Sequence, residues 1–248
     1  MSKSGQWVGL MAVGLLSVRA MGAVNVATDF QTASAPSLPS YTPPYTVSTS
    51  DLINGMSPSA SAGDFGVEIS GGLPALTNGA YEDITQTGGA PDRTHGAFAT
   101  AGGGSGTGST VTYNLNTGAS PGGYNLSNIT VYGGWNDSGR DQQAYTVQYA
   151  TVASPGTFVD LATVNFNPTV PDNTQTANRV IISETTLPFL ATGVAAVRFN
   201  FSPSTENGYS GYAEIDVNGS AVPEPGLFGL IGALGAMGLG IRPRRGVR

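Results

Sequence analysis

Strict alternation of apolar and polar residues is the main pattern in the middle and C-terminal parts of the chain. Four segments show it: 111–115, 145–149, 195–201 and 215–217. Successive side chains of a β-strand point to opposite faces, so this period of two predicts strands with one buried face. In the third segment, the alternation places Phe199 and Phe201 in a core. Arg198 and Asn200 then fall on the opposite face.

Shorter apolar segments, separated by Gly, Asn, Asp and Pro, add further strands. These are 66–69, 129–132, 158–164 and 180–183. No helical period is evident after Asp51. About eight short strands with turn residues between them predict an all-β fold, and we expect a jelly-roll-type β-sandwich over residues 51–220.

The first 50 residues predict two segments that precede this domain. Residues 1–23 combine Lys3, an apolar run at 7–18 and small residues at 20–23, which is the pattern of a signal peptide exported by the Sec translocon. Residues 24–50 are rich in Ser, Thr and Pro, so we expect an extended lead-in that ends in an edge strand at 45–47.

The C-terminal segment, 221–248, has three parts with different physical properties. Prolines keep the first part extended, and the apolar run 226–241 carries no charge, which predicts a single transmembrane helix. Arginines after it mark the end that stays in the cytoplasm. A buried core helix is disfavoured because every third residue from 226 to 238 is glycine. The residues concerned are Val222, Pro223, Glu224, Pro225, Arg242, Arg244 and Arg245.

This order of Pro-Glu-Pro, apolar span and arginine cluster resembles the PEP-CTERM sorting signal of exopolysaccharide-producing Gram-negative bacteria. The resemblance covers residues 222–245. It implies transient anchoring in the inner membrane, cleavage near the Pro-Glu-Pro by an exosortase, and release to the cell surface or extracellular matrix. It implies nothing about the function of the preceding domain.

The charge of the remaining chain limits its partners. Between Val24 and Val222 there are four arginines, no lysine and fifteen acidic residues, a net charge of −11. Nucleic acids and anionic lipid surfaces require a basic patch, so both are disfavoured as partners, whereas divalent cations are favoured. The chain has no cysteine, so the fold depends on its core without disulfides.

The order of predicted strands over residues 50–219 resembles the discoidin-type, galactose-binding-like domains. The resemblance implies a jelly-roll that binds sugars or lipids at loops on one end, with a structural Ca²⁺ held by an early loop and a late glutamate. Here Asn78 stands where that loop has an aspartate, either Glu82 or Asp83 supplies the missing carboxylate, and Glu214 matches the late glutamate. The alternative for Glu214 is a solvated strand residue. The matching segments are 76–79, 110–115, 129–132, 139–141, 145–149, 158–161, 198–201 and 212–217.

Turn-rich segments around 133–143 and 204–212 contain the side chains that usually bind sugars. An aromatic ring stacks on a pyranose, and amides, acids and arginine bond its hydroxyls. In the alternative interpretation, Trp135 and Arg140 fix the loop, with Arg140 bridging Asp137 or Asp141, and His95 is solvated. The candidate ligand-binding residues are Trp135, Asn136, Asp137, Arg140, His95 and Tyr209.

Catalytic signals are sparse. The chain has one histidine, no cysteine and no Gly-x-Ser-x-Gly elbow, so we expect no nucleophilic enzyme and no zinc site. A carboxylate pair for glycoside hydrolysis stays open. We expect an exported, exosortase-processed surface protein whose β-sandwich binds carbohydrate or extracellular polysaccharide. The alternative is a structural matrix or adhesion protein of a biofilm or floc, without a small ligand.

Overall fold

The computed structural model describes residues 22–32, 40–63, 65, 71–82, 84–85, 99–102, 109–135, 139–171, 174–203, 206 and 208–224. The predicted signal peptide up to residue 21, and the apolar run and arginines after residue 224, lie outside this range. Within it, no helix has both the length and the apolar character needed to cross a membrane.

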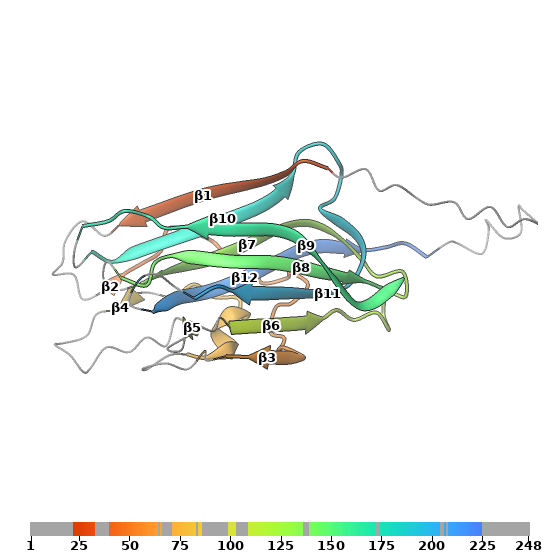
Figure 1. Cartoon of the computed structure of the whole chain (residues 1–248), viewed down its shortest axis with the longest axis horizontal. Coiled ribbons are helices and arrows are strands. Elements are labelled where there is room, and N and C mark those ends of the chain that lie inside the picture. Colours follow the sequence, from red (N-terminus) through yellow and green to blue (C-terminus); the bar gives the residue numbers. More distant parts are fainter. Residues whose placement is uncertain are drawn as a thin grey trace, which may run out of the picture.

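Antiparallel strands make up most of this part of the chain, and they run along the long axis of the molecule (Figure 1). A short 3₁₀ helix, η1 (Leu73–Leu76), lies between β3 and β4. The strands are β1 (Val24–Thr32), β2 (Ser40–Tyr41), β3 (Ala60–Ala62), β4 (Ile84–Thr85), β5 (Ala99–Gly102), β6 (Ser109–Asn114), β7 (Tyr124–Trp135), β8 (Gln143–Thr151), β9 (Ser154–Phe166), β10 (Thr176–Glu184), β11 (Ala191–Phe201) and β12 (Tyr209–Ala221).

Ten of the described strands form two layers, and β2 and β4 pair with each other in a separate two-stranded sheet. In the first sheet the order is β1-β10-β7-β12-β5, and in the second sheet it is β9-β8-β11-β6-β3. The N-terminal part of β11 also pairs with the beginning of β7, at Ala191 and Leu126, and this joins the layers at one end. The chain passes repeatedly from one sheet to the other, so residues far apart in sequence become neighbours.

One apolar core fills the space between the sheets and confirms the predicted alternation. Phe199 and Phe201 are 0% and 2% exposed, and their rings stack with 6.3 Å between centroids. Arg198 and Asn200 lie on the other face and are half-buried. The core contains Val111, Tyr113, Tyr145, Val147, Val197, Phe199 and Phe201 from the second sheet and Ile129, Val131, Val180, Ile182, Ile215 and Val217 from the first. The predicted all-β sandwich is therefore confirmed.

The N-terminal region differs from the expected lead-in. Residues 24–32 are a sandwich strand, β1, which pairs with β10 over its whole length. Nearly all residues of this edge strand are exposed, so the sequence carries little apolar signal for it. Residues 45–47 form no strand. Instead, Tyr45 and Val47 pack with Tyr81 against Tyr132 and Trp135 on the outer face of the first sheet.

The two ends of the described chain lie at the same end of the sandwich (Figure 1). β1 begins and β12 ends there, whereas Trp135 and Tyr209 lie at the opposite end. Trp135 and Tyr209, which the sequence predicts as sugar-binding residues, are therefore distant from residue 224, where the described chain ends.

Candidate functional site

Three carboxylates meet on the outer face of the first sheet. A bulge between Tyr212 and Glu214 shifts the alternation of β12, so Tyr212 and Ile215 both enter the core. Glu214 and Asp216 then point outward, and Asp51 from the segment that crosses this face joins them. The carboxylate oxygens of the three acids lie within 4.8 Å of one another. We call Asp51, Glu214 and Asp216 the acid cluster.

Main-chain N–H groups hold one oxygen of each carboxylate. Ser48 N donates to Asp216 Oδ2 at 2.9 Å, and Gly79 N donates to Glu214 Oε2 at 3.1 Å. The N–H groups of Ile53 and Val217 donate to Asp51 Oδ1 at 2.9 and 3.2 Å. The second oxygens form no hydrogen bond, although they are buried: Asp51 Oδ2, Glu214 Oε1 and Asp216 Oδ1.

The acid cluster is electrostatically unfavourable when all three carboxylates are charged. Burial raises the pKa of Glu214 to about 8, and the charges of Asp216 and Asp51 add to the effect. Burial also raises the pKa of Asp216 to about 6, with Asp51 contributing, and it raises the pKa of Asp51. A divalent cation would remove this repulsion and bond the three unpartnered oxygens, and carboxylate oxygens are the ligands that Ca²⁺ takes.

Burial argues against a catalytic role for these acids. Glu214 and Asp216 are 0% and 2% exposed, so a polymeric substrate has no access to their carboxylates. Hydrolysis of a glycosidic bond needs both carboxyl groups in contact with the substrate. The chemistry that fits the acid cluster is ion binding.

The acid cluster partly matches the residues selected from the sequence. Glu214 is buried rather than solvated, and the early loop does contact it, through Gly79. The side chain of Asn78 is exposed, and its Oδ1 accepts a hydrogen bond from Ala80 N at 2.9 Å. Asp83 lies outside the described residues. The sequence does not indicate Asp216 as a ligand, because alternation alone places it on a solvent face. It does not indicate Asp51 either, since that residue belongs to no predicted strand or motif.

At the end of the sandwich where β7 ends and β12 begins, Arg140 stacks on two aromatic rings. Its guanidinium carbon is 5.0 Å from the Trp135 ring centroid and 4.9 Å from that of Tyr209. Trp135 is the last residue of β7 and is 1% exposed, so its ring offers no free face to a sugar in this conformation. This geometry favours the interpretation in which Trp135 and Arg140 fix the loop. Asn136, Asp137 and His95 lie outside the described residues.

Asp141, next to this stack, is not bridged by Arg140. Its side chain is fully buried, and neither carboxylate oxygen has a hydrogen-bond partner. The neighbouring carboxylate of Glu206 accepts hydrogen bonds from Asp141 N and Gln142 N at 3.2 and 3.3 Å. Burial, and then the contact with Glu206, raises the pKa of Asp141 to about 8.

The outer face of the second sheet carries a row of hydrogen-bonded polar side chains across four adjacent strands. Thr110 Oγ1 donates to Asn200 Oδ1 at 3.1 Å, Asn200 Nδ2 to Gln148 Oε1 at 2.9 Å, and Gln148 Nε2 to Asp160 Oδ1 at 2.7 Å. We call these four residues the polar row. Beside it, Arg198 lies 3.5 Å over the Phe158 ring centroid.

A shallow hollow of about 390 Å³ lies over the polar row. Its floor consists of strand residues, and Ser202 and Pro203 border it at one end. The sequence correctly places Asn200 on the non-core face, but it does not reveal the row. The four members come from strands β6, β8, β9 and β11, and only the sheet register brings them side by side.

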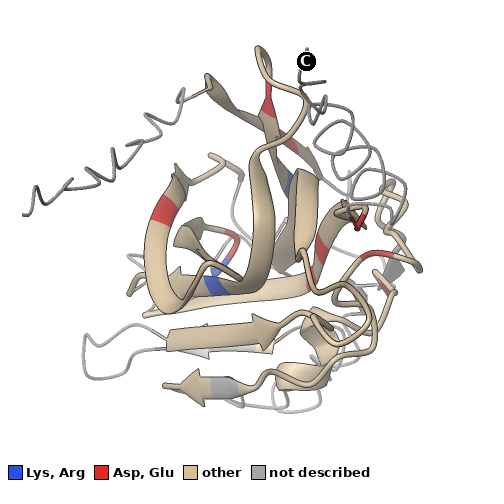
Figure 2. Cartoon of the chain, turned by 90° about the vertical axis from the view of Figure 1, so that its right-hand side faces the viewer, with Lys and Arg blue, Asp and Glu red and all other residues tan. Residues whose placement is uncertain are grey.

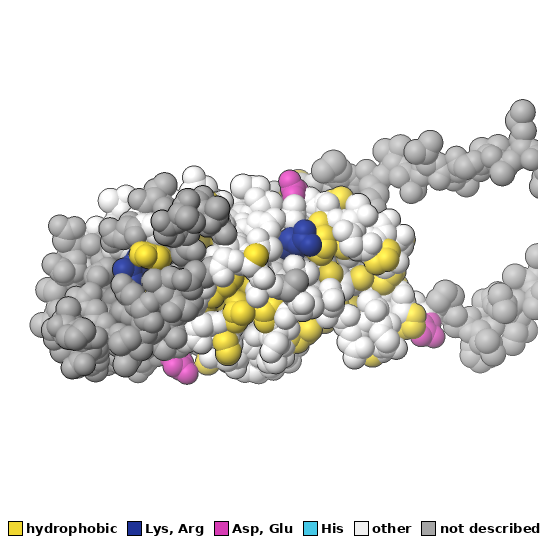
Figure 3. Space-filling model, turned by 60° about the horizontal axis from the view of Figure 1, so that its bottom comes forward, with side chains coloured by type: hydrophobic (Ala, Val, Ile, Leu, Met, Phe, Trp, Pro, Cys, Tyr) yellow, Lys and Arg dark blue, Asp and Glu magenta, His cyan; other side chains and the backbone are white. Residues whose placement is uncertain are grey.

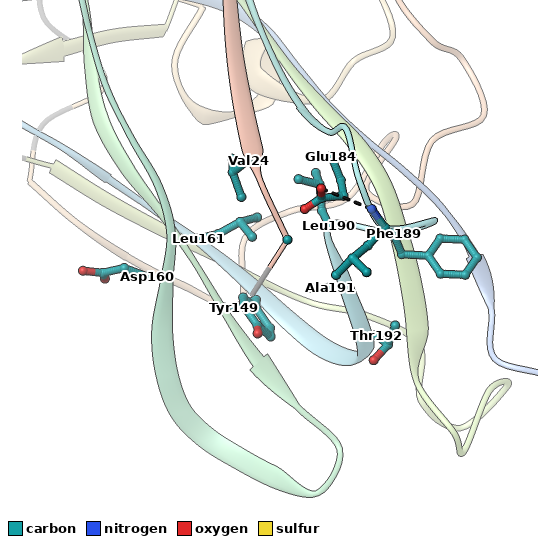
Figure 4. Close-up of a pocket in the computed structure, with 11 residues that line it drawn as sticks. Val24, Tyr149, Asp160, Leu161, Glu184, Phe189, Leu190, Ala191 and Thr192 are labelled. Atoms are coloured by element: carbon teal, nitrogen blue, oxygen red, sulfur yellow. Dashed lines mark hydrogen bonds between the residues drawn. The ribbon is translucent and has the colours of Figure 1, made fainter. Parts of the chain in front are cut away.

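A second cavity, of about 240 Å³, opens between the edge strands β1 and β9. Val24, Leu161 and Leu190 line it, together with Glu184 (Figure 4). Glu184 Oε1 accepts hydrogen bonds from the N–H groups of Thr185, Thr186 and Leu187 at 2.8, 2.7 and 3.3 Å. This carboxylate oxygen therefore fixes the β10–β11 loop.

Comparison with known proteins gives distant structural likenesses. No family model and no curated protein matches the sequence. Among solved structures, the chain is similar to "CBM32 of AlyQ in complex with 4,5-unsaturated mannuronic acid", with 12% identity, a TM-score of 0.30, and coverage of 48% of this chain and 75% of the other. "Truncated AlyQ with CBM32 and alginate lyase domains" gives 12% identity, a TM-score of 0.37, and coverage of 68% and 34%.

Proposed function

We propose that the chain is an exported cell-surface protein whose jelly-roll sandwich binds carbohydrate through the polar row. The observation that carries this proposal is the row itself, with its hydrogen-bonded hydroxyl, two amides and carboxylate under an open hollow. Sugar hydroxyls both donate and accept hydrogen bonds, and side-chain amides do the same. The row is therefore chemically complementary to a sugar surface, and its role is binding rather than catalysis.

The acid cluster has a structural role in this proposal. A Ca²⁺ ion held by Asp51, Glu214 and Asp216 would link the segment before η1 to strand β12. The fit rests on the three unpartnered oxygens. Such an ion stabilises the sandwich without contacting the carbohydrate, because the polar row lies on the other sheet.

The two termini supply the route to the cell surface. In our proposal the Sec translocon exports the chain, the C-terminal apolar segment anchors it briefly in the inner membrane, and an exosortase processes it near Pro223-Glu224-Pro225. The sequence pattern at each terminus supports these steps.

Affinity electrophoresis of the exported protein through gels that contain soluble polysaccharides tests the carbohydrate proposal. We expect retardation by at least one polysaccharide, and we expect it to be lost in Asn200→Ala and Gln148→Ala. The matched control is Asn218→Ala, which removes an amide bonded to Asn128 Oδ1 at 3.1 Å on the first sheet. If no polysaccharide retards the folded protein, the proposal is wrong and a structural matrix role is favoured.

A further inference from the structure

The hydrogen-bond capacity that remains in the polar row indicates which sugars it fits. Asn200 and Gln148 each have two amide N–H groups and use one within the row, so one N–H remains on each. Asp160 at the end of the row can only accept. A ligand for this surface must both donate and accept hydrogen bonds. Hydroxyl groups do so, whereas the carboxylates of uronic acids only accept.

The charges of the described chain disfavour an acidic ligand. Acidic residues clearly outnumber basic ones in the fold (Figure 2), and charged side chains of either sign are sparse on the described surface that Figure 3 shows. Arg140 and Arg179 are engaged elsewhere, the first on two rings and the second on Asp29 and Tyr45. A polyanion would gain little here, because acidic ligands are bound by clusters of arginine or lysine.

The only described arginine on the face of the polar row is itself constrained. Arg198 Nε donates to Thr112 Oγ1 at 3.2 Å, and its guanidinium lies over Phe158. It is directly opposite Gln148 in the strand register, and Asp160 is opposite Gln148 on the other side. One carboxylate therefore offsets one guanidinium, and the described surface has no excess positive charge with which to attract a polyanion.

The geometry of the row also indicates how much of a polymer it contacts. Adjacent strands lie about 4.8 Å apart, so four strands span about 14 Å, which is longer than one sugar ring. The hollow is a shallow depression in a sheet face and has a border from loop residues at one end. A flat surface of this kind contacts consecutive sugars along a chain rather than enclosing a chain end.

We infer that the polar row binds internal stretches of an uncharged polysaccharide and discriminates against uronic acid polymers. This inference rests on the proposed carbohydrate-binding function. Asp160 is the residue that enforces the discrimination, because its carboxylate lies at the end of the row and repels acidic sugars. Asn200 and Gln148 supply the donors for sugar hydroxyls.

Isothermal titration with two neutral polymers (a soluble β-glucan and a galactomannan) and two acidic ones (alginate and polygalacturonate) tests the inference. We expect a neutral polymer to bind with little dependence on salt, and its disaccharide to bind at least tenfold more weakly. Asn200→Ala and Gln148→Ala should weaken binding at least tenfold, and Asn218→Ala should leave it unchanged. Asp160→Asn should reduce the preference for neutral over acidic polymers.

The outcomes separate this inference from the proposal on which it rests. If none of the four polymers nor a broader polysaccharide panel binds, the carbohydrate-binding function itself is wrong. If acidic polymers bind more tightly and salt weakens them, carbohydrate binding stands and the inferred specificity is wrong. The inference is also overturned if a disaccharide binds as tightly as its polymer, or if row variants that retain the wild-type melting temperature bind normally.

Discussion

The main-chain N–H of Gly79 donates a hydrogen bond of 3.1 Å to Glu214 Oε2, and the two residues are 135 positions apart. Gly79 has a φ of 71°, and a Cβ at this position would lie 2.6 Å from Asn54 Oδ1. The turn therefore requires glycine. Since it bonds one oxygen of Glu214 and leaves Oε1 without a partner, the turn fixes the carboxylate with one oxygen available to a cation.

Calcium should stabilise the folded protein through the acid cluster. A ligand present at 100 times its Kd adds about 2.7 kcal/mol to the free energy of unfolding, which for a domain of about 200 residues corresponds to several degrees in melting temperature. Calorimetry of chelator-treated protein with and without millimolar Ca²⁺ measures this shift. Glu214→Gln should remove most of it.

The matched control is Glu184→Gln, since Glu184 lies on the surface and bonds only its own loop in the described structure. This variant should keep the full Ca²⁺ shift. Equal melting temperatures in chelator and in Ca²⁺ would show that the acid cluster holds no calcium.

The metal-free protein should lose stability as the pH rises from about 4.5 to about 8. The pKa of Glu214 is about 8 in the folded state against 4.5 ordinarily, and that of Asp216 is about 6 against 3.8. Between these values the folded state binds more protons than the unfolded state, so the free energy of unfolding falls with pH. Urea unfolding in chelator at pH 5 and pH 8 measures the change. A rise in stability over this interval would contradict it.

Truncation of the stacked phenylalanines should be the most destabilising change on β11. Phe199→Ala and Phe201→Ala should each lower the free energy of unfolding by about 3–5 kcal/mol. The alternation alone predicts a loss under about 0.5 kcal/mol for a solvated Asn200, but its bonds to Thr110 and Gln148 raise the expected loss to about 0.5–1.5 kcal/mol. Urea titrations of the three variants test this order.

Trp135→Ala should destabilise the fold, because the ring is buried against Arg140 and beside Tyr45 and Tyr81. We expect a loss of about 3–5 kcal/mol, in the range for deletion of a buried aromatic side chain. Thermal unfolding together with polysaccharide titration distinguishes a structural role of Trp135 from a role in stacking on a sugar. An unchanged melting temperature with lost binding would instead make Trp135 a sugar-stacking residue.

The C-terminal segment should be absent from the mature protein. If the sorting signal is processed, mass spectrometry of envelope material should find no peptides from residues 226–248. Replacement of Pro223, Glu224 and Pro225 by alanine should leave the precursor in the inner membrane. Intact C-terminal peptides in most molecules would leave a membrane anchor without processing.

Alternation predicts the strands that are buried on one face, and it fails where that condition does not hold. The side-chain directions of Phe199 and Phe201 follow from the sequence because one face of β11 is the core. β1 escapes prediction because it is an exposed edge strand, stabilised by its pairing with β10. Glu214 and Asp216 have the right period for a solvent face, but the N-terminal segment covers that face.

The polar row and the acid cluster could not be found in the sequence for a related reason. Each gathers residues from distant segments, and neither contains a local motif. The sequence signals for a binding site lie instead in loops rich in aromatic and charged residues. Of those residues, the structure brings together Trp135, Arg140 and Tyr209, as a stack that includes a fully covered tryptophan ring.

The long separation in sequence between the partners of the acid cluster affects the order of folding. Ser48 bonds Asp216 across 168 positions, and Asp51 bonds Val217 across 166. Because the chain is synthesised from its N-terminus, these contacts cannot form until β12 has been made. The segment before η1 therefore stays undocked from the first sheet until then. Non-local contacts of this kind slow folding. A fragment that stops before residue 214 should therefore remain an incomplete sandwich, however long it is given to fold.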